Sequence, residues 1–137
     1  MATYKTSDYV KGIVYSLLGS ITKPKYLGTK PTASVAAEYV VINSLPINAN
    51  VMQKCYVNVN YHVKDLNGGA GVGNVPDIAK LEAGSALVMA ALKEVTTAAS
   101  GTVPAYMIDF ESQETIREDQ LGEHYSNLRF SFKNINY

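Results

Sequence analysis

The clearest periodic pattern in the chain is helical and lies near the N-terminus. Apolar residues recur there at the spacing i, i+3, i+4, i+7, i+8, which aligns them along one face of an α-helix. These positions are Val10, Ile13, Val14, Leu17 and Leu18. Ser7 or Asp8 can cap the start of the helix, and Gly19 follows the last apolar residue as a C-terminal stop. We predict a helix here, followed over residues 20–36 by a loop or a short edge strand.

Two different strand patterns follow. Residues 37–45, AEYVVINSL, form a short apolar run that ends at Pro46, as in a strand buried on both faces. Residues 55–63, CYVNVNYHV, alternate without interruption, which is typical of a half-solvated strand in an antiparallel sheet. One face carries Cys55, Val57, Val59, Tyr61 and Val63, and the other carries Tyr56, Asn58, Asn60, His62 and Lys64.

A second helical pattern begins after the glycine-rich stretch LNGGAGVGNVPD, residues 66–77. Pro76 suits the first turn of a helix, and Asp77 is favourable near its positive end. Apolar positions between Ile78 and Val95 keep the helical spacing for about five turns. Small residues cover much of the remaining surface, so we expect this long central helix to pack closely on a sheet.

The last third of the chain predicts a β-hairpin with a definite register. In this register, each residue of the first strand pairs with the residue of the second strand whose number brings the sum to 240. Apolar residues then face each other, and residues of opposite charge lie side by side. The pairs include Ile108–Phe132, Phe110–Phe130, Glu111–Arg129 and Arg117–Glu123. Residues Glu118–Gly122 then form a loop that ends in glycine. This register assigns Gln113, Thr115 and Arg117 to the solvated face, and Ile116 to the apolar face.

The order helix, strand, strand, helix, strand, strand predicts the α+β class. We expect a mainly antiparallel four-stranded sheet, with the N-terminal helix and the long central helix packed on one face. At 137 residues, the chain is expected to form a single domain over residues 1–137.

Charge changes this picture in two ways. Charged residues make up 18% of the chain, against roughly 25% in typical soluble domains, and the net charge is zero. A zero net charge argues against non-specific binding of nucleic acid through overall charge. A surface with few charges is typical of a protein whose surface is largely buried in contacts with neighbouring molecules. Residues 1–30 are mostly basic and residues 109–123 mostly acidic. The two regions can pair within one chain or head to tail between copies.

Several features limit where the protein is expected to work. The N-terminus lacks the apolar segment of a signal peptide, and no apolar run approaches the roughly 20 residues of a membrane span. The single cysteine, Cys55, excludes an intramolecular disulfide. We therefore expect a soluble protein, made in a reducing cytoplasm, that does not bind membranes.

The glycine-rich stretch matches no complete nucleotide-binding motif. Gly68 and Gly73 have the spacing of a phosphate-binding loop, but Asn74 and Val75 stand where that loop requires lysine and a hydroxyl residue. The dinucleotide-binding pattern also fails at Asn74. We expect a flexible connection here, and no cofactor.

Metal binding and nucleophilic catalysis also lack support. His62 and His124 are the only histidines, and His62 lies on the strand face opposite Cys55, whereas a zinc site needs three or four converging ligands. Cys55 is expected in the core, and His62 at a solvated or interface position. Ser85 lies within a predicted helix and has no G-x-S-x-G turn. We predict no catalytic residue, no metal site and no enzyme activity.

Binding through strand edges, polar faces and loops is a better prospect, because an open four-stranded sheet has two edges. The alternative interpretation is that the polar strand face is simply exposed to solvent and binds no partner. The candidate interface residues are Lys23, Lys25, Tyr56, Asn58, Asn60, Gly69, Gly71, Glu118 and Asp119.

The layout of nearly the whole chain resembles that of the small tail-terminator and tail-completion proteins of tailed bacteriophages. The most specific part runs from Cys55 to Val95, where VNVNYHV leads through the glycine-rich connection to a helix that begins at a proline. This resemblance implies a structural virion protein without an active site. Its copies would form a ring, usually of six, that ends the tail tube or joins the tail to the head.

The same resemblance implies the partners and the location. The ring would contact tail-tube and head-connector proteins at the neck of the virion. It would leave a channel through which DNA passes without sequence-specific binding, and it would be made in the cytoplasm of the bacterial host.

A head-to-tail ring needs two different complementary patches. The basic N-terminal region, with Lys23 and Lys25, and the acidic hairpin, with Glu118 and Asp119, can supply them. Other head-completion or stopper rings of the neck share the size and the absence of catalytic residues. A small cytoplasmic α+β protein-interaction module with no role in a virion is the remaining alternative.

Overall fold

The computed structural model describes residues 4–29, 36–50, 52–66, 75–92, 94–97, 106–118 and 122–135. Within these ranges the chain forms α1 (Ser7–Leu17), β1 (Lys25–Leu27), β2 (Glu38–Ser44), β3 (Met52–Lys64), α2 (Ile78–Leu92), β4 (Glu94–Thr97), β5 (Tyr106–Glu118) and β6 (Glu123–Ile135). None of the helices in these ranges is long and apolar enough to span a membrane.

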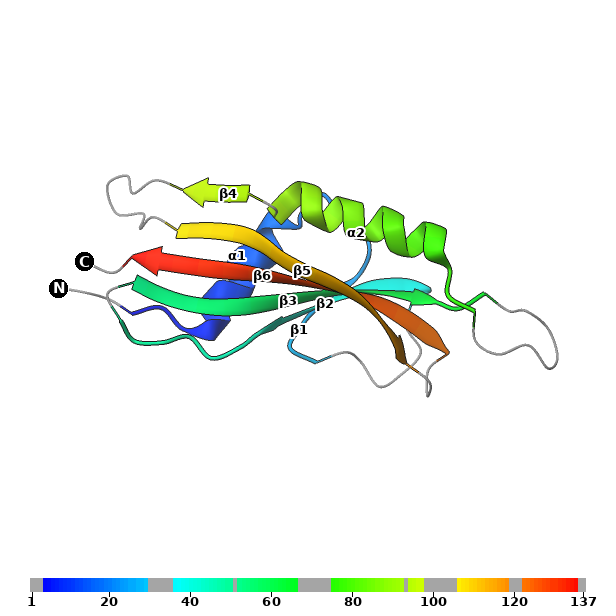
Figure 1. Ribbon diagram of the computed structural model, residues 1–137, viewed down its shortest axis with the longest axis horizontal. Helices are drawn as coiled ribbons and strands as arrows, with labels where there is room; N and C mark the ends of the chain where they lie inside the picture. The colour runs from blue at the N-terminus through cyan, green and yellow to red at the C-terminus, as the bar shows by residue number, and fades with distance from the viewer. Residues whose placement is uncertain are drawn as a thin grey trace.

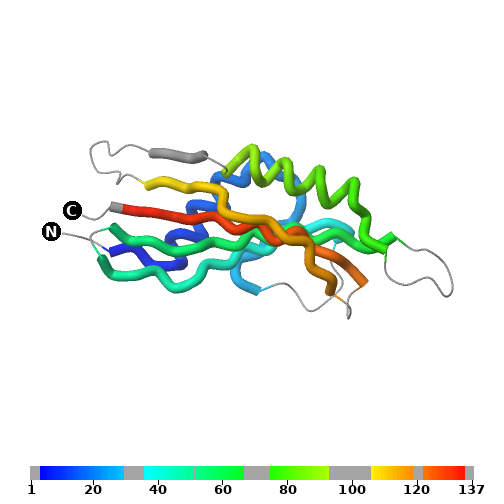
Figure 2. The backbone as a smooth tube through the Cα atoms, in the orientation of Figure 1, coloured from blue at the N-terminus to red at the C-terminus, as the bar shows by residue number. Residues whose placement is uncertain are grey.

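The strands form one twisted sheet with the order β1-β2-β3-β6-β5-β4 (Figure 1). β1 and β2 are parallel, and every other neighbouring pair is antiparallel. β3 and β6 run side by side along the centre of the molecule, in register from Met52–Ile135 to Lys64–Glu123 (Figure 2). The predicted α+β class with a mainly antiparallel sheet is confirmed.

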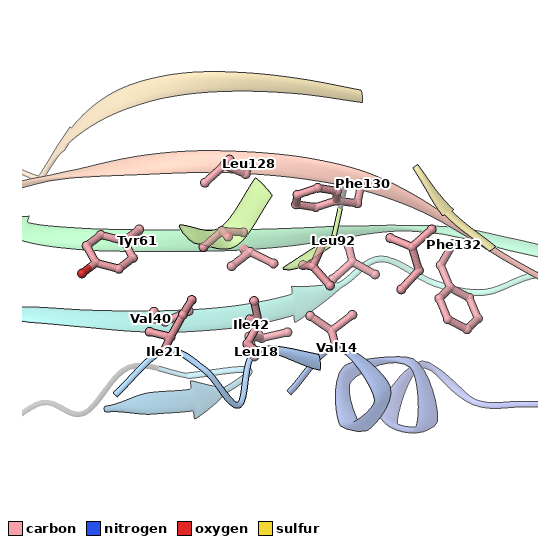
Figure 3. Close-up of a cluster of buried hydrophobic side chains, with 14 of the residues drawn as sticks. Val14, Leu18, Ile21, Val40, Ile42, Tyr61, Leu92, Leu128, Phe130 and Phe132 are labelled. Carbon is pink, nitrogen blue, oxygen red and sulfur yellow. The ribbon is translucent and has the colours of Figure 1, made fainter. Parts of the chain in front are cut away.

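Both helices pack on the same face of the sheet, as predicted, and share one hydrophobic core with it (Figure 3). The alternation of β3 is also confirmed, because its odd-numbered residues from Cys55 to Val63 are buried under the helices. The remaining core side chains include Val10, Val14, Leu18, Ile21, Val40, Ile42, Leu81, Val88, Leu92, Ile108, Leu128, Phe130 and Phe132.

α2 approaches β3 closely at a glycine. A Cβ atom added to Gly84 would lie 2.3 Å from the ring of Tyr61. The Tyr61 hydroxyl lies at the margin of the core and donates a hydrogen bond of 2.8 Å to Glu38. Position 84 therefore has room for hydrogen only, and this sets the distance between the helix and the sheet.

Two predicted boundaries are wrong. The side chain of Thr6, rather than Ser7 or Asp8, caps α1, by accepting a hydrogen bond from the backbone nitrogen of Tyr9. α2 ends at Leu92, and the segment Glu94–Thr97 pairs with β5 as a strand. The helical pattern had included Val95, but the run Val-Thr-Thr at 95–97 is β-branched and favours a strand.

Within the described residues the sheet has six strands instead of the predicted four. The described part of residues 20–36 contains the short edge strand β1, one of the two possibilities that we expected there. β4 is the second addition, and it extends the sheet on the other side, next to β5.

The β5–β6 hairpin follows the predicted register only in its first half. The pairs Ile108–Phe132 and Phe110–Phe130 are confirmed, but the register shifts by one residue between Phe110 and Ser112. Glu111 is the extra residue of this bulge. The predicted pairs Glu111–Arg129 and Arg117–Glu123 are therefore wrong, as is the loop starting at Glu118. The observed partners are Ser112–Arg129, Arg117–His124 and Glu118–Glu123.

The bulge exchanges the two faces of β5, because one inserted residue reverses the alternation of all residues after it. Gln113 and Thr115 now lie opposite Leu128 and Ser126, on the side of the helices. Ile116 lies opposite Tyr125, on the other side. The predicted faces of these three β5 residues are the reverse of the observed ones.

Candidate interaction surfaces

The face of the sheet opposite the helices carries a ladder of polar side chains, which we call the outer face. On its central strands, Asn127 donates a hydrogen bond of 2.6 Å to Asn60. Arg129 donates one of 3.2 Å to Asn58, and its guanidinium lies 5.5 Å from the centre of the Tyr56 ring. The predicted interface residues Tyr56, Asn58 and Asn60 therefore form one half-buried row on β3, held in place by β6.

One end of the outer face is buried and aromatic. The ring of His62 stacks between those of Tyr39 and Tyr125, with centroid distances of 4.5 and 4.6 Å. Its Nδ1 lies 2.8 Å from Oε1 of Glu123, and the Tyr39 hydroxyl donates to the same oxygen. The expectation that His62 is a solvated or interface side chain is wrong. It is 3% exposed, because aromatic neighbours on the adjacent strands enclose it.

Two buried tyrosines, Tyr39 on the outer face and Tyr61 on the helix side, are held as hydrogen-bond donors. Burial, followed by the hydrogen bond to Glu123, raises the pKa of Tyr39 well above its ordinary value. Burial and the hydrogen bond to Glu38 raise the pKa of Tyr61 in the same way. Both hydroxyls stay protonated at neutral pH, where each satisfies a carboxylate.

The second histidine is paired at the same end of the sheet. His124 Nδ1 lies 2.5 Å from Oδ1 of Asp65, just beyond the end of β3. Neighbouring residues of β6 alternate between faces, so His124 points to the helix side, whereas the His62–Glu123 pair is on the outer face. The two pairs do not converge. In the described ranges, no three or more His, Cys, Asp or Glu side chains are grouped so that they could hold a metal ion.

Among the described residues, the contacts of the two candidate nucleophiles are with core and structural groups. Cys55 lies in the core as predicted, and burial raises the pKa of its thiol. The Ser85 hydroxyl donates to the Leu81 carbonyl at 2.8 Å and lies 2.6 Å from the Ser126 hydroxyl, which also accepts from Gln113 at 2.9 Å. These polar contacts join α2 to β6 and β5, so their role is to position the helix.

A groove of about 940 Å³ lies between α2 and the second half of β5. Gln113 and Thr115 lie on the strand side of this groove, where the bulge has turned them toward the helix. On the α2 side the groove is mainly apolar, and it is lined by Ile78, Ala79, Leu81, Glu82, Ala83, Ala86 and Met89. The sequence pattern does not reveal the groove, because it predicts Gln113 and Thr115 on the solvated outer face.

α2 provides a signal that could have revealed this surface. Its side chains are apolar on nearly every side, and Ile78 and Leu87 are 62% and 47% exposed. A helix that is apolar all round is normally covered all round. The exposed side of α2 is therefore a candidate interface.

The charged candidates lie in separate environments. Lys23 forms an ion pair of 3.4 Å with Glu38, while Lys25 donates to the Ile21 carbonyl at 2.6 Å and lies 5.6 Å from the centre of the Tyr15 ring. Glu118, at the end of β5, lines a second pocket of about 280 Å³ on the outer face. The other residues of this pocket are Gly28, Thr29, Val41, Asn43, Asn60, His62 and Tyr125.

The structure thus brings two of the candidate interface residues, Asn60 and Glu118, into one pocket. Gly69, Gly71 and Asp119 lie outside the described residues. An antiparallel bridge between Leu66 and Val75 joins the two ends of the glycine-rich connection.

The fold is shared with a chain in a solved structure described as "Virion of native gene transfer agent (GTA) particle". The two chains superpose with a TM-score of 0.67 and 16% sequence identity, over 97% of this chain and 99% of the other. No protein-family model and no curated protein sequence matches the chain.

Proposed function

We propose that this protein is a structural component of a tailed-phage-like particle and forms a ring at the neck. In the leading form of this proposal it is a tail terminator that closes the tail tube. In the second form it is another ring that joins the tail to the head. The observation that carries the proposal is the likeness of fold, over nearly the full length of both chains, to a chain from a gene transfer agent virion.

The surfaces of the chain are compatible with this role. A ring subunit needs one pair of patches for its neighbours and further surfaces for the rings above and below it. The described residues include a polar outer face, an apolar helix face beside a groove, and strand edges on both sides of the sheet. The composition, with 18% charged residues, suits a subunit whose surface is largely covered.

We further propose that six copies, each a single domain over residues 1–137, surround a channel for DNA. The zero net charge suits passage of DNA without sequence-specific binding. Tail-tube and head-connector proteins are the other proposed partners. Gly69 and Gly71 in the glycine-rich connection, and Glu118 and Asp119 in the hairpin, are proposed contacts to them.

The test is peptide mass spectrometry on particles purified by density gradient from the phage or induced host that encodes the chain. We expect the chain at a few copies per particle, near the copy number of other neck proteins and far below that of the tube protein. Deleting the gene should leave heads and tails unjoined, or tails of uncontrolled length, and supplying the gene in trans should restore normal particles.

Absence of the chain from particles in which portal and tube proteins are readily detected would remove the virion role. The groove beside α2 would then favour the second candidate, a cytoplasmic protein-interaction module. Such a module should keep a fixed small mass at all protein concentrations in native mass spectrometry, whereas a ring subunit should assemble as the concentration rises.

A further inference from the structure

One edge of the sheet is open beside the groove. β4 pairs only with Tyr106–Asp109, and the structure describes no strand beside Phe110–Glu118 on the side away from β6. An open strand edge presents backbone donors and acceptors to which another strand can pair. A strand added there would direct alternate side chains toward the helix side of the sheet, where α2 lies (Figure 1). The groove is on this side.

The other edge of the sheet, β1, has complementary properties. Its pairing with β2 uses the Pro24 carbonyl and the Gly28 amide. Because backbone groups alternate in direction along a strand, those of Lys25 and Leu27 point away from β2. The side chains of Lys25 and Leu27 share the helix side with their partners Val40 and Ile42.

We propose that β1 of a second copy pairs with the open edge of β5 and inserts Leu27 into the groove under α2. This inference rests on the proposed ring and identifies the contact between its subunits. Leu27 is 49% exposed, and the groove offers it the apolar side chains of Ile78, Ala83 and Met89.

Charge complementarity supports a second copy as the occupant. Glu82, which is exposed, is the acidic residue among those that line the groove. The β1 edge carries Lys25 on the same side as Leu27. Lys11, whose Nζ would be 3.8 Å from a Cβ at Gly28, is paired with Asp8 at 3.1 Å. Glu82 in the groove and Lys25 beside Leu27 are therefore opposite charges that can meet between two copies.

The contact joins two different patches, so each copy can bind one neighbour through β1 and another through β5. Repetition of such a head-to-tail contact gives a closed ring when the rotations between successive copies add up to a full turn. The sheets would then continue from one subunit to the next, with the helices of all copies on the same side.

The decisive experiment is disulfide cross-linking between copies. Two single variants, L27C and A83C, are purified, mixed at high concentration and oxidised, and the products are separated without reductant. We expect a covalent dimer from the mixture and none from either variant alone. The native Cys55 is buried and should not react. The double variant L27C/A83C should give a ladder of oligomers whose largest member reports the number of subunits in the ring.

The matched control is Y26C mixed with A83C. Tyr26 is adjacent to Leu27 in the strand and points to the opposite face, so we expect little product. Equal cross-linking by Y26C, or a dimer from L27C or A83C alone, would overturn the proposed contact. A cross-link to a tube protein from particles, in place of the self cross-link, would also overturn it.

These experiments distinguish failure of the proposed contact from failure of the proposed ring. Oligomers in native mass spectrometry without the L27C–A83C product would reject this interface and leave the proposed function standing. A protein that stays monomeric at all concentrations and is missing from particles would reject both. As a second measurement, L27D should weaken self-association at least about tenfold, while L45D, also at an exposed leucine, should not.

Discussion

Tyr39 illustrates how individual polar residues stabilise the outer face. It is 1% exposed although it lies on the face without helices, and its hydroxyl donates to the buried carboxylate of Glu123. A buried carboxylate is costly unless hydrogen bonds satisfy it, and here His62 and Tyr39 both contact it. The neighbouring aromatic rings exclude water and preserve these contacts.

The raised pKa of Tyr39 and Tyr61 predicts loss of stability in alkali. Their pKa values are above the value of about 10 expected in the unfolded chain. Above pH of about 10 the unfolded chain therefore loses protons that the folded chain keeps, and the free energy of unfolding falls by about 1.4 kcal/mol per pH unit for each tyrosine. Below that pH their contribution is fully present.

The measurement is urea unfolding between pH 8 and pH 11, with tyrosinate absorbance recorded in parallel. At neutral pH, Tyr39→Phe should cost about 1–3 kcal/mol, because it removes a donor from a buried carboxylate. The variant should also show a shallower alkaline loss than the native chain. The exposed control Tyr15→Phe should change stability by less than about 0.5 kcal/mol. Full tyrosinate absorbance from a folded protein near pH 10.5 would contradict the prediction.

At the scale of elements, two features decide how α2 lies on the sheet. The contact at Gly84 brings the helix close to β3, and the bulge at Glu111 places Gln113 and Thr115 beneath the part of α2 that borders β5. Gln113 hydrogen-bonds to Ser126, so it remains satisfied on the helix side. The same bulge that produces the groove thus also supplies a polar contact between β5 and β6.

Gly84→Ala should lower the free energy of unfolding by about 1–3 kcal/mol, because the new methyl group would overlap the Tyr61 ring. The matched control is Gly12→Ala within α1, where nothing lies within 4 Å of the added Cβ. That variant should gain about 0.5–1 kcal/mol from helix propensity. Thermal and urea unfolding of both variants provide the comparison. A neutral Gly84→Ala would mean that α2 can move away from β3 at little cost.

At the scale of the whole molecule, the arrangement of charge becomes relevant. The chain has no net charge, yet Glu82 in the groove and Lys25 on the β1 edge differ in sign. Such a distribution favours association in one orientation over others. It also makes association sensitive to salt, because exposed charges are screened over about 8–10 Å at physiological ionic strength.

Reversing Lys25 to Glu should weaken self-association by roughly tenfold at low salt, and less at high salt, because it places a negative charge near Glu82 of the next copy. The measurement is light scattering after size exclusion over a range of concentrations. K25E mixed with E82K should recover part of the lost affinity through the exchanged pair. Unchanged assembly by K25E, with stability matched to the native chain, would contradict the proposed role of this charge.

Local periodicity by itself determined much of the fold. The apolar stripe of α1, the alternation of β3 and the first half of the β5–β6 register follow from side-chain spacing, and the structure confirms them. These features depend on neighbours in sequence, or on one pair of strands at a time. A composition with 18% charge and no complete ligand-binding motif also directed attention to surfaces rather than to a catalytic centre.

The tertiary structure decided the rest, because each remaining feature depends on contacts between distant segments. A single extra residue, Glu111, reversed the faces of β5, and no periodicity marks where such a residue will be inserted. His62 is buried because Tyr39, Tyr125 and Glu123 reach it from neighbouring strands. The groove and the two strand edges exist only once the order of the six strands is set, and that order is a property of the whole sheet.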